Sequence, residues 1–258
     1  MKNILPVSGI VIKELYRRKH FYVLFILTVL ICLVMASVNI FNDDKIVRYL
    51  KEVCLLLVWI ASLVIAITTT ARQIPSEREN RTLFPLLAKP LSRTELLLGK
   101  FLGCWLACGL TLVCFYLFFG LLASSREHHW PLLNYLQAGA LHWAMLGVVI
   151  ALTLLGSLLF AAPSSNATIC FVIVSGILLL GRHLNKVALP LPEPRRSLLY
   201  TLYYAIPHLE LFDVRDLIIH NWPPIAWRVC GLAALYALAY AGVFLIAACL
   251  VFRRRALN

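Results

Sequence analysis

Long apolar stretches without ionisable side chains are the feature that most constrains what this chain can fold into. Asp, Glu, Lys and Arg are absent from residues 21–42, 53–71, 101–125, 130–181 and 229–252. A helix needs about 20 mainly apolar residues to cross the hydrocarbon core of a bilayer. An ionisable side chain inside that core costs roughly 2.5–3.5 kcal/mol on insertion scales. The pattern therefore predicts a protein whose helices lie in a membrane.

The apolar stretches divide into six predicted membrane-spanning helices. Hydrophobic residues make up 61% of the 258 residues and charged residues 14%, whereas a soluble domain is about 45–50% apolar. We therefore predict an all-α integral membrane fold, with a single six-helix domain over residues 21–258. A tight turn at 163–166 is expected between the fourth and fifth spans. The predicted spans are residues 21–41, 53–71, 101–124, 137–162, 167–181 and 229–252.

The distribution of Lys and Arg predicts which connections face the cytoplasm. With the N-terminus inside, the inner segments carry 14 of the 24 basic residues, none of them in the 163–166 turn. The outer loops carry ten, six of which lie in the long connection 182–228, where charge is weakly informative. Both termini and residues 72–100 are therefore predicted to be cytoplasmic. This placement at helix ends, rather than nucleic-acid binding, accounts for the formal net charge of +12.

Residues 1–20 are predicted to form an amphipathic helix on the cytoplasmic membrane surface. Its apolar positions recur at helical spacing, and its charged positions lie opposite, where they face anionic headgroups. A flexible basic tail is the alternative. The apolar positions are Ile4, Val7, Ile10, Val11 and Leu15, and the charged ones are Lys13, Glu14, Arg17 and Arg18.

The segment 72–100 is a long polar interruption with an ordered pattern. Ser76 precedes Glu79 by three residues, and Ser92 precedes Glu95 by three, so each pair matches a capping box at a helix N-terminus. We expect a short helix, a break around residues 85–90, and a second helix that runs directly into the third span. On spacing alone, an ordinary basic loop between two membrane helices is an equal alternative.

The connection 182–228 is too apolar for a plain loop. Residues 198–206 carry an apolar stripe at helical spacing that Pro207 ends, and residues 209–219 are long enough for a second short helix. We predict a re-entrant helical hairpin that dips into the outer leaflet, where its backbone polar groups need protein or water as partners. A periplasmic cap on the membrane surface is the alternative. The acidic residues Glu210, Asp213 and Asp216 are interpreted as charges on a wet loop.

No constellation of residues indicates catalysis, a metal or a cofactor. The chain lacks a GxxxxGK[ST] phosphate loop, and its eight cysteines fall in apolar stretches without a zinc or disulfide pattern. Cys104 and Cys108 share a helix face that could hold a soft metal, but small packing residues are the favoured interpretation. His142 is expected to be interfacial. The uncharged spans argue against an ion-coupled carrier, so any transport must be driven by a partner.

The polar segment resembles the signature of permease subunits of type-2 ABC exporters. The pattern E-x-E-x-x-T-L-x-x-L-L-A-K-P-x-S-R-x-E-x-x-x-G-K begins at Glu77 and ends at Lys100. The order of elements is also similar: a surface helix, six spans, the signature between spans two and three, and a hairpin before the last span. Within the family the chain is most similar to permeases associated with maturation of copper enzymes such as nitrous oxide reductase. Arg81 stands where many relatives carry glycine before the threonine.

The resemblance implies that residues 72–100 form a coupling helix seated on a cytoplasmic ATPase. Two copies of the permease would pair with two separate ABC ATPase subunits, which bind the ATP and magnesium, in the inner membrane of a bacterium. ATP-driven closure would rock the spans between inward- and outward-facing states. The chain itself would be no enzyme and hold no cofactor. The residues implied at the ATPase interface are Glu77, Arg78, Glu79, Arg81, Thr82, Lys89, Pro90, Ser92, Arg93 and Glu95.

Two further functions fit the same pattern less well. A membrane scaffold or assembly factor could dock a soluble partner on the basic segment and transport nothing. A secondary carrier conflicts with the uncharged spans. The substrate is not readable from the sequence: an apolar pathway between two copies suits lipid-like or peptide cargo, whereas a copper-enzyme assembly factor would act on a periplasmic partner protein.

Overall fold

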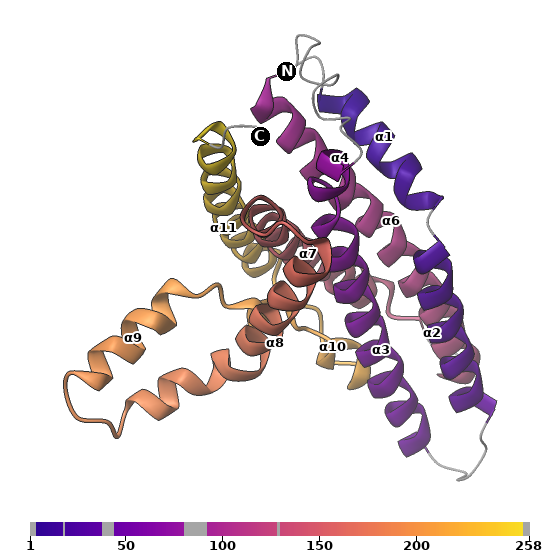
Figure 1. The fold of residues 1–258 in the computed structure, drawn as a ribbon. Helices are drawn as coiled ribbons and strands as arrows, with labels where there is room; N and C mark the ends of the chain where they lie inside the picture. Colours follow the sequence, from indigo (N-terminus) through magenta and orange to yellow (C-terminus); the bar gives the residue numbers. More distant parts are fainter. Residues whose placement is uncertain (1–3, 18, 38–43, 80–91, 128–129, 255–258) are drawn as a thin grey trace.

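The described residues form an all-helical bundle in a computed structural model that covers 4–17, 19–37, 44–79, 92–127 and 130–254 (Figure 1). This confirms the all-α class. The helices are α1 (Ile4–Tyr16), α2 (Lys19–Ser37), α3 (Asp44–Ala71), α4 (Pro75–Glu79), α6 (Arg93–Glu127), α7 (Leu132–Leu159), α8 (Pro163–Ala188), α9 (Arg195–Ala205), the 3₁₀ helix η1 (Leu209–Phe212), α10 (Asp216–Ile219) and α11 (Trp227–Arg254).

Five helices among the described residues are long and apolar enough to cross a membrane. They are Val47–Glu79, Arg93–Ser125, Leu132–Leu159, Pro163–Gly181 and Trp227–Arg254. The predicted first span corresponds to α2, within which Phe25–Val34 is a shorter apolar helix. The structure thus supports five of the six predicted spans by length and composition. The predicted first span, residues 21–41, stays a prediction.

Two helix boundaries differ from the predicted ones. A loop was expected up to Glu52, but α3 already begins at Asp44, and Lys51 in this added stretch is completely buried, with its ammonium group satisfied by protein. The predicted turn at 163–166 is instead the first turn of α8, which begins with Pro163. Proline suits the first helical turn because its missing N–H would have no helical partner.

Segments that were predicted to lie on the same side of the membrane lie together in the bundle. The start of α6, the end of α11, α1 and α4 gather at the upper end in Figure 1, which we call the inner end. The starts of α3 and α7, the end of α6 and α10 meet at the opposite, outer end. The grouping agrees with the prediction that successive connections between spans face opposite sides of the membrane. That the inner end faces the cytoplasm stays a prediction.

The helix α1 packs along α6, while its predicted place on the membrane surface stays a prediction. Val7 and Val11 contact α6 at Gly99 and Gly103, where an added Cβ would lie 2.7 Å from each valine Cβ. Two glycines four residues apart let helix backbones approach closely in a membrane. The buried face is narrower than the predicted apolar face, because Ile10 remains 62% exposed.

A cluster of hydrogen bonds fastens the connection before α11 to the outer end. Lys51 Nζ lies 2.6 Å from Glu127 Oε2 and donates to the Ile218 carbonyl at 3.0 Å and to Asn221 Oδ1 at 3.2 Å. On α7, Asn134 donates to the carbonyls of Leu217 and Trp222, and Gln137 exchanges two hydrogen bonds with Ile225. We call these contacts the outer clamp.

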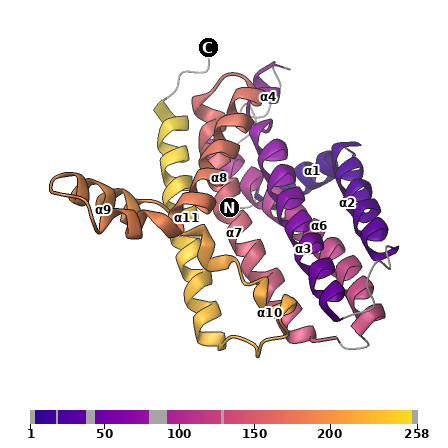
Figure 2. The same cartoon turned by 90° about the horizontal axis from the view of Figure 1, so that it is seen from below.

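The helix α9 forms an arm that projects from the bundle. It was predicted to pair with a second short helix, but it lies beside the last turns of α8, as both views show (Figures 1 and 2). No residue of α9 is buried. The predicted second helix is split into η1 and α10, which pack on the bundle through Leu209, Phe212 and Ile218. Whether the arm enters the bilayer stays a proposal.

We predict that Gly103→Ala loosens α1 from α6. The new Cβ would meet the Val11 side chain at 2.7 Å and the Ser8 carbonyl oxygen at 3.0 Å. Overpacking of this kind costs about 1–3 kcal/mol, so the thermal unfolding midpoint in detergent should fall. Gly9→Ala is the matched control, because its Cβ would meet nothing within 4 Å. Equal midpoints for the two variants would contradict the packing.

We predict that Lys51→Met frees the connection before α11. The substitution removes all three donors that hold Ile218, Asn221 and Glu127, and it leaves their oxygens unsatisfied. Amide hydrogen exchange over residues 217–225 should become faster, as measured by mass spectrometry. Lys186→Met, at an exposed lysine near the end of α8, should leave exchange in that segment unchanged. Unchanged protection in Lys51→Met would show that Lys51 does not hold this segment.

Candidate functional site

An ion pair at the inner end joins the predicted coupling segment to the membrane-spanning helix that follows it. Lys100 Nζ lies 2.7 Å from Glu77 Oε1, and it also donates to the backbone oxygen and to Oε1 of Gln73, both at 3.1 Å. The lysine is 3% exposed and the glutamate side chain 19%. A lysine buried this deeply needs such partners, because an unpaired buried charge is strongly destabilising. We call this arrangement the inner clamp.

One of the two predicted capping boxes is confirmed and the other is wrong. At the start of α6, the Glu95 amide donates to Ser92 Oγ and the Ser92 amide donates to Glu95 Oε2, each at 3.2 Å. This reciprocal pair satisfies two backbone donors that the helix end leaves open. Ser76 instead lies inside α4 and donates to the Arg72 carbonyl at 2.6 Å. The backbone is already helical at Pro75, so the N-cap position is Ile74 and Ser76 lies two residues too late to cap the helix.

The start of α6 is also tied to the end of α11. Arg93 Nη1 donates to the carbonyl of Phe252 at 2.9 Å, and the guanidinium group lies 5.7 Å from the centre of the Phe252 ring. The last carbonyls of a helix lack partners within the helix and attract cations. Arg93 therefore joins two membrane-spanning helices at the level of the coupling segment.

The predicted interface residues divide into clamped, exposed and undescribed groups. Glu77, Arg93 and Glu95 make the contacts given above, within the permease itself. Glu79 and Ser92 are exposed, and Arg78 is half-buried. Arg81, Thr82, Lys89 and Pro90 lie outside the described residues. The exposed carboxylate of Glu79, at the end of α4, can accept hydrogen bonds from basic groups on a second protein.

A second polar cluster lies in the middle of the bundle, where sequence analysis expected an interfacial histidine. His142 is completely buried: Nε2 is 2.9 Å from Ser62 Oγ and Nδ1 is 3.3 Å from the Tyr116 hydroxyl. The His142 ring stacks on the ring of Trp59. The Arg215 guanidinium lies 5.1 Å from the centre of the Trp59 ring. Both ring nitrogens have partners, and Ser62 is only 2% exposed. The cluster therefore joins α3, α6 and α7 inside the bundle.

Some residues that shape the ends of the bundle were missed by sequence analysis. The spacing of Gly99 and Gly103 was a readable signal, because small residues four apart mark close helix contacts in membranes. Lys51, Asn134 and Gln137 gave no comparable signal, since their partners are mostly backbone carbonyls up to 167 residues away in the chain.

The described residues hold no evident centre for a metal. Within the ranges that the structure covers, no three His, Cys, Asp or Glu side chains come together in a way that could bind a metal ion. Cys104 and Cys108, the pair considered above, are buried and form no disulfide. Their environment in the bundle is that of small packing residues.

Comparison with known proteins identifies the family. No curated protein matches the sequence. A family model described as ABC-2 family transporter protein matches residues 10–257, which is nearly the whole chain and includes both clamps. The chain therefore belongs to the ABC-2 family of transporter proteins, as a membrane-spanning permease subunit of an ABC transporter.

Proposed function

We propose that two copies of this permease assemble with two separate cytoplasmic ABC ATPase subunits and export a substrate by alternating access. The observation that carries the proposal is the inner clamp, in which Lys100 binds Glu77 and thereby fixes α4 to α6. Family membership implies an ATPase partner. ATP and magnesium would bind to that partner, and α4 would be the part of the coupling segment that receives its movement.

The inner clamp offers a direct path for the movement of α4 into the membrane. The helix α6 runs without a break from Arg93 to Glu127, and a helix of 35 residues is about 52 Å long at 1.5 Å per residue. A displacement of α4 would therefore tilt α6 as a rigid rod through the Glu77–Lys100 pair. Arg93 would pass the same displacement to α11, and Gly99 and Gly103 would pass it to α1.

The contact with the ATPase is assigned to the exposed part of the coupling segment. Glu79 and Arg78 would face the ATPase, together with Arg81, Thr82, Lys89 and Pro90, which the resemblance implies. Ser92 and Glu95 would hold the return into α6 through their capping box. Glu77 supports the contact indirectly, because its carboxylate is occupied by Lys100.

The finer assignment to a subfamily rests on the resemblance of the signature. A permease associated with copper-enzyme maturation, such as that of nitrous oxide reductase, would act in a bacterial inner membrane with both termini in the cytoplasm. A periplasmic partner would then meet the outer end, where the outer clamp fixes residues 217–225. The second copy and the surrounding lipid would cover the exposed apolar faces of the spans.

We predict that Glu79→Ala weakens assembly with the ATPase encoded beside this chain. Loss of one charge-assisted contact, worth about 1.5–3 kcal/mol, should weaken association about tenfold or more. Co-purification from membranes and ATP hydrolysis in lipid would measure it. Glu52→Ala is the control: this glutamate is 43% exposed at the outer end and forms an i,i+4 pair with Arg48, so both readouts should stay at the wild-type level.

The outcome of this experiment also decides between the permease and the scaffold. A two-plus-two complex whose hydrolysis falls in Glu79→Ala supports a coupled permease. The exporter proposal would be contradicted if the permease purified without any ATPase and did not respond to nucleotide. That result would favour the scaffold.

We predict that Glu77 and Lys100 act as one unit. Lys100→Met should lower the free energy of unfolding by about 1–3 kcal/mol, because it leaves Glu77 and Gln73 oxygens without their donor. The double variant Glu77→Gln/Lys100→Met should be more stable than the sum of the single changes implies. Unfolding in detergent, for all four members of the cycle, measures the coupling. Strict additivity would show that the two side chains do not interact.

A further inference from the structure

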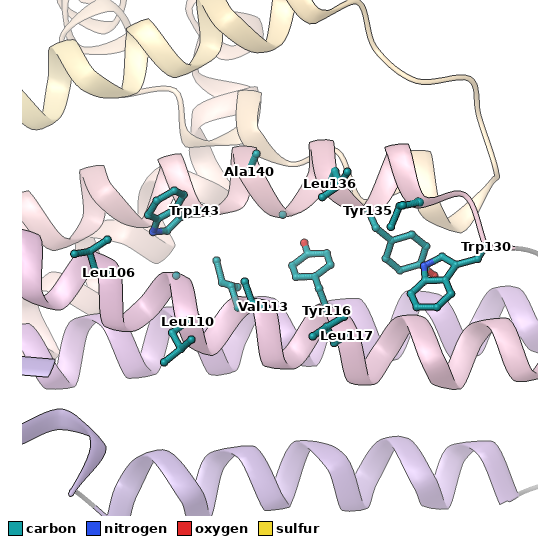
Figure 3. A pocket seen from close by; sticks show the side chains of 14 residues that line it. Leu106, Leu110, Val113, Tyr116, Leu117, Trp130, Tyr135, Leu136, Ala140 and Trp143 are labelled. Carbon is teal, nitrogen blue, oxygen red and sulfur yellow. The ribbon is translucent and has the colours of Figure 1, made fainter. Parts of the chain in front are cut away.

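An apolar groove of about 520 Å³ lies between α6 and α7. Its walls come from Leu106, Leu110, Val113 and Leu117 on α6 and from Leu136 and Ala140 on α7 (Figure 3). No charged residue lines it. A groove of this size falls within the range of small-molecule sites, roughly 300–1,000 Å³.

Tryptophans close both ends of the groove. At one end Trp105 and Trp143 stack with ring centres 4.5 Å apart, and each indole N–H donates to the backbone carbonyl of the other residue at 2.9 Å. At the other end Trp130 lies over Gly120, where an added Cβ would be 3.3 Å from the indole ring. Trp130 is 42% exposed. A partly exposed tryptophan at the end of a span is typical of the membrane–water interface.

The length and position of the groove correspond to one leaflet. On α7 its lining runs from Leu132 to Trp143, the first twelve residues of a 28-residue helix. At 1.5 Å per residue this is about 16 Å, close to half of the roughly 30 Å hydrocarbon core. The groove thus extends from the outer end, beside Trp130, to the middle of the membrane, where Trp143, stacked on Trp105, forms its floor.

We propose that this groove binds one acyl chain of a phospholipid from the leaflet at the outer end. Hydrocarbon is the medium that surrounds these spans, and an acyl chain brings no polar group that the apolar walls would leave unsatisfied. A peptide segment would bring unpaired backbone groups. A helix of a second copy, about 10–12 Å across with its side chains, is too wide for a groove between two adjacent helices that contact each other at the Trp105–Trp143 stack.

The polar atoms near the groove are already engaged or lie at its mouth. The Tyr116 hydroxyl is 3.3 Å from His142 Nδ1, inside the bundle. The Trp130 indole stands at the interface, at the level where a lipid headgroup would be. The lipid would therefore be held by the shape and length of its chain and anchored near Trp130. This site does not depend on pairing with an ATPase.

The test uses a glycine that leaves the groove open. An added Cβ at Gly139 would meet nothing within 4 Å, although the residue lines the groove. Gly139→Phe should therefore fill the space without disturbing the helix packing. Gly176→Phe on α8 is the control, because its Cβ also meets nothing within 4 Å and it lies outside the groove.

The purified permease is exchanged into palmitoyl-oleoyl phosphatidylethanolamine, washed with detergent and weighed by native mass spectrometry. Wild type and Gly176→Phe should retain one phospholipid per chain, and Gly139→Phe should lose it. Equal retention by all three proteins, or none by wild type, would overturn the proposal. If Gly139→Phe fails to fold, Val113→Phe on the opposite wall takes its place.

A second measurement follows tryptophan fluorescence of the permease without an ATPase partner. Phospholipid that carries bromine near the end of its acyl chain should quench tryptophan fluorescence, because Trp143 lines the groove at its closed end. Replacing Trp143 by Phe should remove a large share of that quenching, whereas Trp222→Phe, at an exposed site outside the groove, should not. Equal quenching in wild type and Trp143→Phe would contradict the placement of the acyl-chain end at the floor of the groove.

Discussion

The cost of leaving a polar group unsatisfied in hydrocarbon governs the arrangement of this bundle. Each buried cation at a membrane end, Lys51 and Lys100, is surrounded by oxygens from a carboxylate, an amide side chain and a backbone carbonyl. Such groups contribute little when paired and cost several kcal/mol when one partner is missing. Each lysine therefore fixes the elements that supply its oxygens. Two clamps at opposite ends result, and α6 belongs to both through Lys100 and Glu127.

This arrangement gives the signature residues a role inside the permease as well as toward a partner. Glu77 and Lys100 are 23 positions apart at the borders of the signature, and they form the inner clamp. Gly99 makes room for α1, and Ser92 with Glu95 begins α6. A segment that must transmit force needs rigid anchors at both borders, and these contacts supply them. In the proposed assembly, the exposed carboxylate of Glu79 would face the ATPase.

The sequence was sufficient to predict whatever depends on local pattern. Helical class, most spans, the start of α6 and its capping box follow from apolar run length and from Ser92-x-x-Glu95. What could not be predicted depends on contacts between distant segments. His142 was expected at an interface because polarity alone does not show that Ser62 and Tyr116 supply its partners. The burial of Lys51 in α3 likewise depends on its contacts with Glu127 and Ile218, which no local pattern encodes.

The helix α6 connects the proposed coupling contact with the proposed lipid site. Lys100 at the inner clamp is five residues before Trp105, which stacks on Trp143 at the floor of the groove. A tilt of α6 against α7 would therefore change the width of the groove, unless the two helices moved together. An acyl chain between them would favour the separation at which it fits. Since a ligand shifts an equilibrium only by its different affinity for the two states, lipid chain length would then bias the permease toward one of its conformations.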